Sequence, residues 1–389
     1  MATEVAPVTP TVLRWARESV GATVADAAKR AGVTEDRLLS WEAGEAEPTL
    51  AKLRSLAKLY QRPLAVFFLD EPPREFDAMR DFRRLPDTDE SAWSRPLHKT
   101  YRRAVEQQEI MAELLRADDI PVGAKVPLAA VDEHPEEAGS RARAALHVTL
   151  EDQRGWRNPD VALKGWLEAL EEAGVLVLRT SEVASAEMRG FSMPGEVPVV
   201  MINATDPPRA QIFTALHEFA HLMLHAEGLC DLIGSSTGTA AQVETWCNAV
   251  AAATLMPREP FLAALGDAAT YSNSWEEDVI GQLSERWVVS REAVVRRLLS
   301  LNLTSATFYQ QKRDEYRTAF ENWRAEEKLR RRGKSGGPPP YRMAIRDRGR
   351  PYVRLVLDAY QRNAISTSSL SRLLALRTKH IPDLEREVS

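Results

Sequence analysis

Residues 206–224 read DPPRAQIFTALHEFAHLML, and this stretch decides the fold around it. Asp206 is a suitable N-cap, and Pro207 and Pro208 suit the first turn of a helix. Apolar residues follow at the i, i+3 and i+4 spacing of a buried helical face, namely Ile212, Phe213, Leu216, Ala220, Met223 and Leu224. The spacing therefore predicts a helix that begins near residue 206 and packs in a core.

This helix carries His217-Glu218-Phe219-Ala220-His221, a complete H-E-x-x-H motif of the kind found in zinc hydrolases. His217 and His221 lie one turn apart, so both imidazoles can reach a single Zn²⁺ at about 2.0–2.1 Å. Glu218 is offset by about 100° around the helix axis and can act as a general base toward water. The alternative interpretation is a pair of core histidines without a metal.

A catalytic zinc usually has three protein ligands, so a third one is needed. The metzincin spacing fails, because the sequence has Leu224 and Glu227 where that class has glycine and histidine. His225 lies about 6 Å further along the helix, and three successive turns do not converge on one ion. Glu244 is a better candidate, on a second predicted helix that ends near Pro257. An exposed glutamate at a helix start is, however, equally ordinary.

Two segments resemble the ImmA/IrrE family of zinc metallo-endopeptidases. They are HEFAHLMLH at residues 217–225 and ETWCNAVAAATLMP at residues 244–257. The family pattern has HExxH, a variable loop and E-x-x-[A/C]-N-x-F-A-A-x-L-L-M-P. The chain departs from it at Val250 and Thr254, which affect packing and no ligand. The resemblance covers about residues 140 to 300.

The resemblance implies that His217, His221 and Glu244 bind Zn²⁺ and that Glu218 is the catalytic base. It also implies a narrow regulatory substrate, typically a DNA-binding repressor that is cut during a stress or induction response. The expected activity is therefore zinc-dependent cleavage of a regulatory protein. The alternative is an antitoxin-like or transcriptional regulator that binds DNA and a partner toxin, with a zinc site that is not catalytic. Glu218 favours the enzyme, because a structural site needs no general base.

Short apolar runs bounded by turn residues predict buried strands at residues 174–178 and 198–202. A strand near the motif helix is expected to pair with extended substrate, and the candidates are residues 190–192 and 199–203. The alternative is that both segments only form the core of the sheet. Helices that cover the core are predicted at residues 98–117, 142–147 and 159–174. The expected fold class is α+β, with a mainly helical, zincin-like peptidase core and a small sheet, preceded by an all-α helix-turn-helix domain.

The N-terminal part has a helix-turn-helix pattern, with helices over residues 24–31 and 34–42 and a turn between them. It resembles the Xre/lambda-repressor family of DNA-binding domains. In that family the second of these helices would lie in the major groove, with Thr34, Arg37 and Ser40 as the exposed readers of DNA. The carboxylates at the front of this helix oppose phosphate binding. The alternative is a helical module that binds protein.

A second helix pair, residues 278–287 and 291–299, has a similar pattern. Its candidate DNA contacts are Arg291, Arg296 and Arg297, and the alternative is a pair of helices that buttresses the peptidase with solvated arginines outside. From residue 328 to residue 354, many basic residues accompany only one acid, around a Gly/Pro-rich loop. This strip would attract phosphates or an acidic protein, or serve as a solvated connector.

The chain has 389 residues, which suits two or three domains, and 44% of them are hydrophobic, which is enough for real cores. The net charge of -5 says little about partners. Cys230 and Cys247 are the only cysteines, and neither a signal peptide nor a long apolar run is present. These features predict a cytoplasmic protein without a membrane partner. The predicted divisions are a helix-turn-helix domain at 1–70, a linker at 71–95, the peptidase at 96–305 and a helical tail with the basic loop at 306–389.

Overall fold

The computed structural model describes residues 6–18, 22–60, 62, 64–71, 93–121, 123–224, 237–266, 271–331 and 337–388. They form two compact units. The first contains the described residues up to 105 together with residues 182–187, and the second contains the others. Helices dominate, one small sheet lies in the second unit, and the N-terminal domain is helical, so the predicted α+β class is confirmed. No helix within these ranges combines the length and apolarity that crossing a membrane requires.

The helix-turn-helix domain consists of α1 (Pro10–Glu18), α2 (Val24–Ala31), α3 (Glu35–Glu42), α4 (Leu50–Tyr60) and the short 3-10 helix η1 (Leu64–Phe68). Thr23 caps α2 by accepting a hydrogen bond from the Asp26 amide at 3.1 Å. Gly32 ends α2 in the left-handed conformation with φ 63°, and Thr34 then caps α3. Gly32 and Thr34 set the turn, and the two helices predicted around it are confirmed.

The second unit contains a sheet of β1 (Leu176–Thr180), β2 (Gly190–Met193) and β3 (Val199–Asn203). The middle strand is β3, which is parallel to β1 and antiparallel to β2. The two apolar runs predicted as strands form β1 and β3. Because β3 is paired on both sides, the prediction that residues 199–203 pair with substrate is wrong. The other candidate is β2, which pairs with β3 and with no second strand among the described residues.

Further helices follow up to residue 331, and the boundary between the two units falls within α5. They are α5 (Arg95–Ala117), α6 (Pro135–Ala145), α7 (Leu150–Gly155), α8 (Pro159–Glu172), α9 (Pro208–Leu224), α10 (Thr237–Leu255), α11 (Arg258–Leu265), α12 (Glu277–Trp287), α13 (Arg291–Ser300) and α14 (Ala306–Arg331). The predicted helices at residues 98–117 and 159–174 correspond to α5 and α8. The helix predicted at residues 142–147 overlaps only the end of α6, which begins at Pro135 and stops before His147, a residue with a positive φ of 51°. The helix pair predicted after residue 277 corresponds to α12 and α13.

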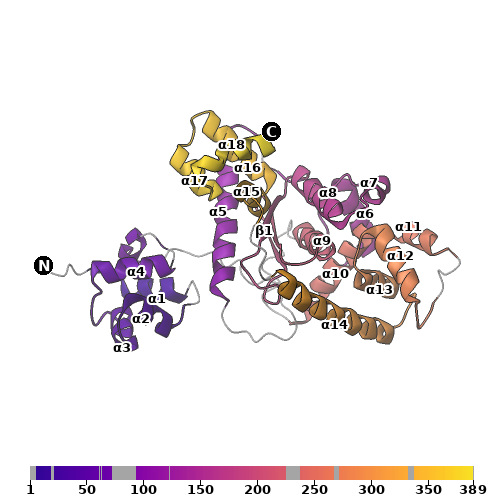
Figure 1. Cartoon of the computed structure of the whole chain (residues 1–389), viewed down its shortest axis with the longest axis horizontal. Coiled ribbons are helices and arrows are strands. Elements are labelled where there is room, and N and C mark those ends of the chain that lie inside the picture. The colour runs from indigo at the N-terminus through magenta and orange to yellow at the C-terminus, as the bar shows by residue number, and fades with distance from the viewer. Residues whose placement is uncertain are drawn as a thin grey trace. The chain divides into compact units, whose positions relative to one another are not determined.

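Helix α9 is buried almost all the way round. It contacts β2, β3, α8 and α10, and Figure 1 shows it between α8 and α10. From Gln211 to Leu224 every side chain is buried except Phe213. The helix nevertheless carries polar residues in this core, including His217, Glu218 and His221. Burying such groups is costly unless they are paired or bind a metal, so their presence here requires a specific arrangement.

The end of α10 is held by buried side chains from three other helices. Its last carbonyls belong to Thr254, Leu255 and the following Met256. Arg143 of α6 donates to the first of these at 2.9 Å, Gln153 of α7 to the second at 3.0 Å, and Arg297 of α13 to the third at 2.9 Å. These bonds satisfy carbonyls that a helix end leaves without a partner, and two of the donors are cations at the negative end of the helix dipole.

Arg297 is therefore part of the core. It is 1% exposed and makes two hydrogen bonds to the Glu136 carboxylate, at 2.5 and 2.8 Å. The prediction that Arg297 contacts DNA is wrong, because the side chain is enclosed and paired. Arg291 is paired with Glu277 at 3.1 Å, and Arg296 lies over the ring of Tyr309. Their contact with DNA stays a prediction.

The C-terminal tail packs against β1. It consists of α15 (Pro340–Arg348), α16 (Arg350–Gln361), α17 (Thr367–Leu374), the 3-10 helix η5 (Thr378–His380) and α18 (Ile381–Val388). A Cβ atom on Gly349 would lie 2.8 Å from the Val177 carbonyl oxygen, so the tail approaches the strand closely. Part of the basic strip stabilises the tail itself, because Arg350 and Arg354 donate to the carbonyls of Glu387 and Val388. This part of the chain belongs to the second compact unit.

We expect Arg297→Ala to lower the free energy of unfolding by about 3 kcal/mol, because it leaves Glu136 without its cation in a mostly buried setting. The control is Arg317→Ala, which removes a 59% exposed arginine of α14. It should cost less than about 0.5 kcal/mol. Urea denaturation measures both variants. Equal losses would contradict the structural role of Arg297.

We also expect a pH effect from Glu171 of α8, which accepts a hydrogen bond from the Arg350 amide at 3.2 Å. Burial raises the pKa of Glu171 from 4.5 to about 8. Its contribution to stability is therefore complete below its unfolded pKa and is lost as the pH rises through its folded pKa. Between about pH 5 and pH 8, the free energy of unfolding should fall more for the parent than for Glu171→Gln. Parallel losses in urea denaturation at the two pH values would disprove this.

Candidate metal centre

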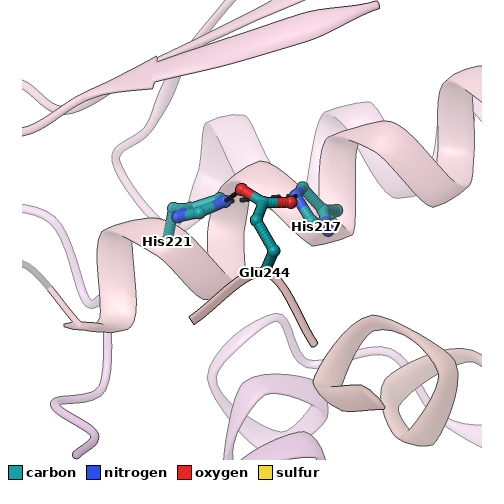
Figure 2. Close-up of side chains that lie close together, drawn as sticks. All are labelled: His217, His221 and Glu244. Carbon is teal, nitrogen blue, oxygen red and sulfur yellow. Dashed lines mark hydrogen bonds and ion pairs between the residues drawn. The ribbon is translucent and has the colours of Figure 1, made fainter. Parts of the chain in front are cut away.

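Three side chains from two helices converge beside the sheet. His217 and His221 lie on successive turns of α9, with their Nε2 atoms 3.1 Å apart. Glu244 of α10 places Oε2 3.4 Å from Nε2 of His217 and Oε1 3.1 Å from Nε2 of His221. Figure 2 shows the carboxylate between the two imidazoles, with one oxygen facing each ring. Glu244, whose role the sequence spacing alone left open, thus lies next to both histidines.

The spacing of these atoms fits a metal ion. All three ligand atoms lie within 4.8 Å of one another, and the group stands out as a candidate metal site in the described part of the chain. Ligands on a tetrahedral zinc lie about 3.3 Å apart, since each bond is about 2.0–2.1 Å long. The observed separations of 3.1 to 3.4 Å agree with this value. Two imidazoles and a carboxylate also match the donor set of many catalytic zinc sites.

Solvent can reach this group from the side of α10. His217 is fully buried and the side chain of His221 is 6% exposed, whereas the side chain of Glu244 is 37% exposed. A structural zinc site is usually closed by protein ligands, and a catalytic one keeps a position for water or substrate. A site with three protein ligands, one of which is partly exposed to solvent, is therefore suited to catalysis.

The electrostatics of the site favour a positive charge between the ligands. Burial alone would raise the pKa of Glu244, but hydrogen bonds from His217 and His221 outweigh it and hold that pKa well below its usual range. Burial would likewise lower the pKa of His221, yet its hydrogen bonds with Cys247 and Glu244 raise it well above its usual value. The same atoms that share a proton here can share a metal cation.

Cys247 lies one turn after Glu244 and is fully buried. Burial raises the pKa of its thiol, so the neutral form is favoured. The thiol is also a hydrogen-bonding partner of His221. The sequence signal for this contact was the spacing of Cys247 one turn after Glu244. His225, Glu227 and Cys230 lie outside the described residues.

Glu218 lies between α9 and the sheet and is 2% exposed. The hydroxyl of Ser192 on β2 donates a hydrogen bond to its Oε2 atom at 3.1 Å. Sequence analysis recognised residues 190–192 as a candidate substrate strand but missed this bond. The only signal was a pair of small residues, Gly190 and Ser192, on one face of the strand.

The predicted DNA readers of α3 partly serve the helix itself. Thr34 accepts a hydrogen bond from the Arg37 amide at 3.3 Å, which caps the helix. The hydroxyl of Ser40 donates to the Arg37 carbonyl at 2.8 Å. Arg37 itself is exposed. DNA contact by Thr34, Arg37 and Ser40 stays a prediction.

We expect purified protein to contain about one zinc per chain, and His221→Ala and Glu244→Ala to lose it. His225→Ala should retain the metal, because three successive turns of a helix do not converge on one ion. Elemental analysis after dialysis measures the content. Equal loss from His225→Ala and His221→Ala would show that the ligand set is misassigned. Retention by Glu244→Ala would point to Cys247 or Glu227 as the third ligand.

Comparisons with known proteins support both parts of this architecture. Residues 13–67 match the helix-turn-helix family model, and residues 170–299 match the peptidase family M78 model, described as an IrrE N-terminal-like domain. A search of curated proteins finds no match. A solved Mycobacterium tuberculosis transcriptional regulator is 17% identical, with a TM-score of 0.27, over 43% of this chain and 52% of that one. The match thus spans about half the length of that regulator. The chain therefore has the ImmA/IrrE architecture predicted from its sequence, a helix-turn-helix domain followed by an IrrE N-terminal-like domain.

Proposed function

We propose that the protein is a zinc-dependent endopeptidase of the ImmA/IrrE type that cleaves a regulatory protein, in the first place a transcriptional repressor, during a stress or induction response. One observation carries the proposal: the His217, His221 and Glu244 side chains converge, and Glu218 lies on the same helix between the two histidines in sequence. The match to a family of metal-dependent peptidases supports it.

The residues have distinct roles in this proposal. His217, His221 and Glu244 would hold the zinc. When bound, zinc polarises the carbonyl of the peptide bond and lowers the pKa of a water molecule. Glu218 accepts a proton from the attacking water and then donates it to the leaving amine. Its burial limits competition from bulk water for the hydrogen bonds of its carboxylate.

The substrate would bind as an extended segment along β2. This strand already contacts α9 and pairs with β3 in antiparallel fashion. An added peptide strand gains main-chain hydrogen bonds, while alternate side chains provide specificity. Such pairing would lay the peptide across the helix that carries Glu218.

The helix-turn-helix domain supports a substrate class connected with DNA. Contact of α3 with an operator through Thr34, Arg37 and Ser40 would bring the peptidase close to a repressor that is bound there. Because most DNA affinity comes from phosphate contacts, the exposed Glu35 and Asp36 would weaken this binding. The proposed compartment is the cytoplasm, where such repressors act.

A second candidate function rests on the same helix-turn-helix domain. The protein would then regulate transcription or neutralise a partner toxin by binding alone, with the metal site serving the fold. The two candidates differ in what they require of Glu218. Only the peptidase needs a proton carrier at that position.

We expect Glu218→Gln to retain zinc and its melting temperature and to lose cleavage by about 10²-fold to 10⁴-fold. The amide cannot accept the proton from water, but it preserves the shape of the side chain. The control is Glu259→Gln on α11, where the glutamate side chain is 87% exposed. It should leave cleavage unchanged.

The substrate is identified first, by capture on immobilised Glu218→Gln protein, which binds but does not cut. Candidates are also co-expressed, starting with DNA-binding proteins and toxins encoded beside this chain. A Glu218→Gln protein that regulates or neutralises as well as the parent, with no fragment produced by either, would reject the peptidase in favour of the binding function.

A further inference from the structure

The contact between β2 and the motif helix involves a hydroxyl and a carboxylate. Ser192 donates to Oε2 of Glu218 at 3.1 Å. Ser192 is half-buried, whereas Glu218 is 2% exposed. A hydrogen bond in a site that is shielded from bulk water is electrostatically stronger than the same bond in water. The strand therefore holds one end of the Glu218 side chain.

The backbone of β2 is placed for this contact by Gly190. A Cβ atom on Gly190 would lie 2.5 Å from Cγ2 of Thr214 and 3.1 Å from Oε1 of Glu218. It would also lie 3.0 Å from the carbonyl oxygen of Met201 on β3. Any larger residue would push the strand away from α9. The glycine thus permits a close approach of strand and helix at the level of Glu218.

The register of the sheet fixes Ser192 at the same level. Gly190 is opposite Ile202 and Ser192 is opposite Val200 on β3. Residues two apart on a strand project to the same face, so Gly190 and Ser192 both face α9. The position of the hydroxyl is therefore set by the sheet and not by a loop.

We propose that Ser192 is a positioning residue for the general base, holding the Glu218 carboxylate in the orientation that proton transfer requires. The inference rests on the proposed peptidase function. A glutamate side chain has several rotatable bonds, and fixing one oxygen restricts them. Misplacement of a reacting group by about 1 Å can cost on the order of 10²-fold in rate. The strand proposed to take up substrate is then also the strand that orients the base.

Two variants of equal shape test the role of the hydroxyl. Ser192→Thr keeps it, and Ser192→Val replaces it with a methyl group, so the added bulk is the same in both. The parent protein first cuts the substrate that Glu218→Gln captured, which locates the cleaved bond. The probe is then a quenched fluorescent peptide that spans this bond. We expect Ser192→Thr to keep a kcat within about 3-fold of the parent and Ser192→Val to lose about 10-fold to 100-fold in kcat, with KM unchanged.

Other measurements separate positioning from a structural role. Zinc content should be the same in the two variants, and circular dichroism should show both folded at the assay temperature. In the Glu218→Gln background, Ser192→Val should leave the Kd for the uncut peptide and the residual rate unchanged, because the base is already absent. Crystal structures of the variants should show the Glu218 side chain reoriented in Ser192→Val alone. If the added methyl group prevents folding of these two variants, Ser192→Ala is compared with the parent instead.

The outcomes distinguish this inference from the function on which it rests. Equal kcat values for Ser192→Thr and Ser192→Val would overturn it, as would a raised KM at unchanged kcat or loss of zinc from Ser192→Val. If Glu218→Gln is as active as the parent, the peptidase function itself fails. An unchanged Glu218 orientation in the Ser192→Val crystal structure would overturn the positioning role whether or not the chain is a peptidase.

Discussion

The desolvation of α9 is the constraint on which the second unit depends. A helix that is buried over most of its surface offers little solvent to stabilise two imidazoles and a carboxylate, so each needs a partner within the protein or a metal. Glu244 meets this need for the histidines, and Ser192 meets part of it for Glu218. The positions of α10 and β2 relative to α9 are therefore also conditions for burying these groups.

Local patterns were sufficient to predict the central elements. The H-E-x-x-H spacing places two histidines on one side of any α-helix, and apolar runs with turn residues at their ends identified β1 and β3. Threonine and glycine around residues 23 to 34 likewise defined the helix-turn-helix turn. Glu244 was a candidate from spacing and became the implied third ligand through the family resemblance. Its proximity to both histidines depends on the packing of α10 against α9.

Other features depend on contacts between residues that are distant in sequence. Arg297 is one of several arginines in a basic helix, and its partner Glu136 is 161 residues away. Charge alone does not reveal which arginine faces the core. Similarly, the bond between Ser192 and Glu218 follows from strand register and from the small size of Gly190. The position of β3 between two strands could not be derived from its apolar sequence, because a buried edge strand would read the same way.

The carbonyl contacts at the end of α10 also affect the opposite end of that helix. Glu244 lies eleven residues before Leu255, which corresponds to about 16 Å along a helix axis. A small tilt of α10 at the end held by Arg143, Gln153 and Arg297 would therefore displace the Glu244 carboxylate at the other end by a larger distance. Substitutions near Leu255 are therefore expected to lower metal affinity, as loss of a ligand would, although they lie far from the metal site.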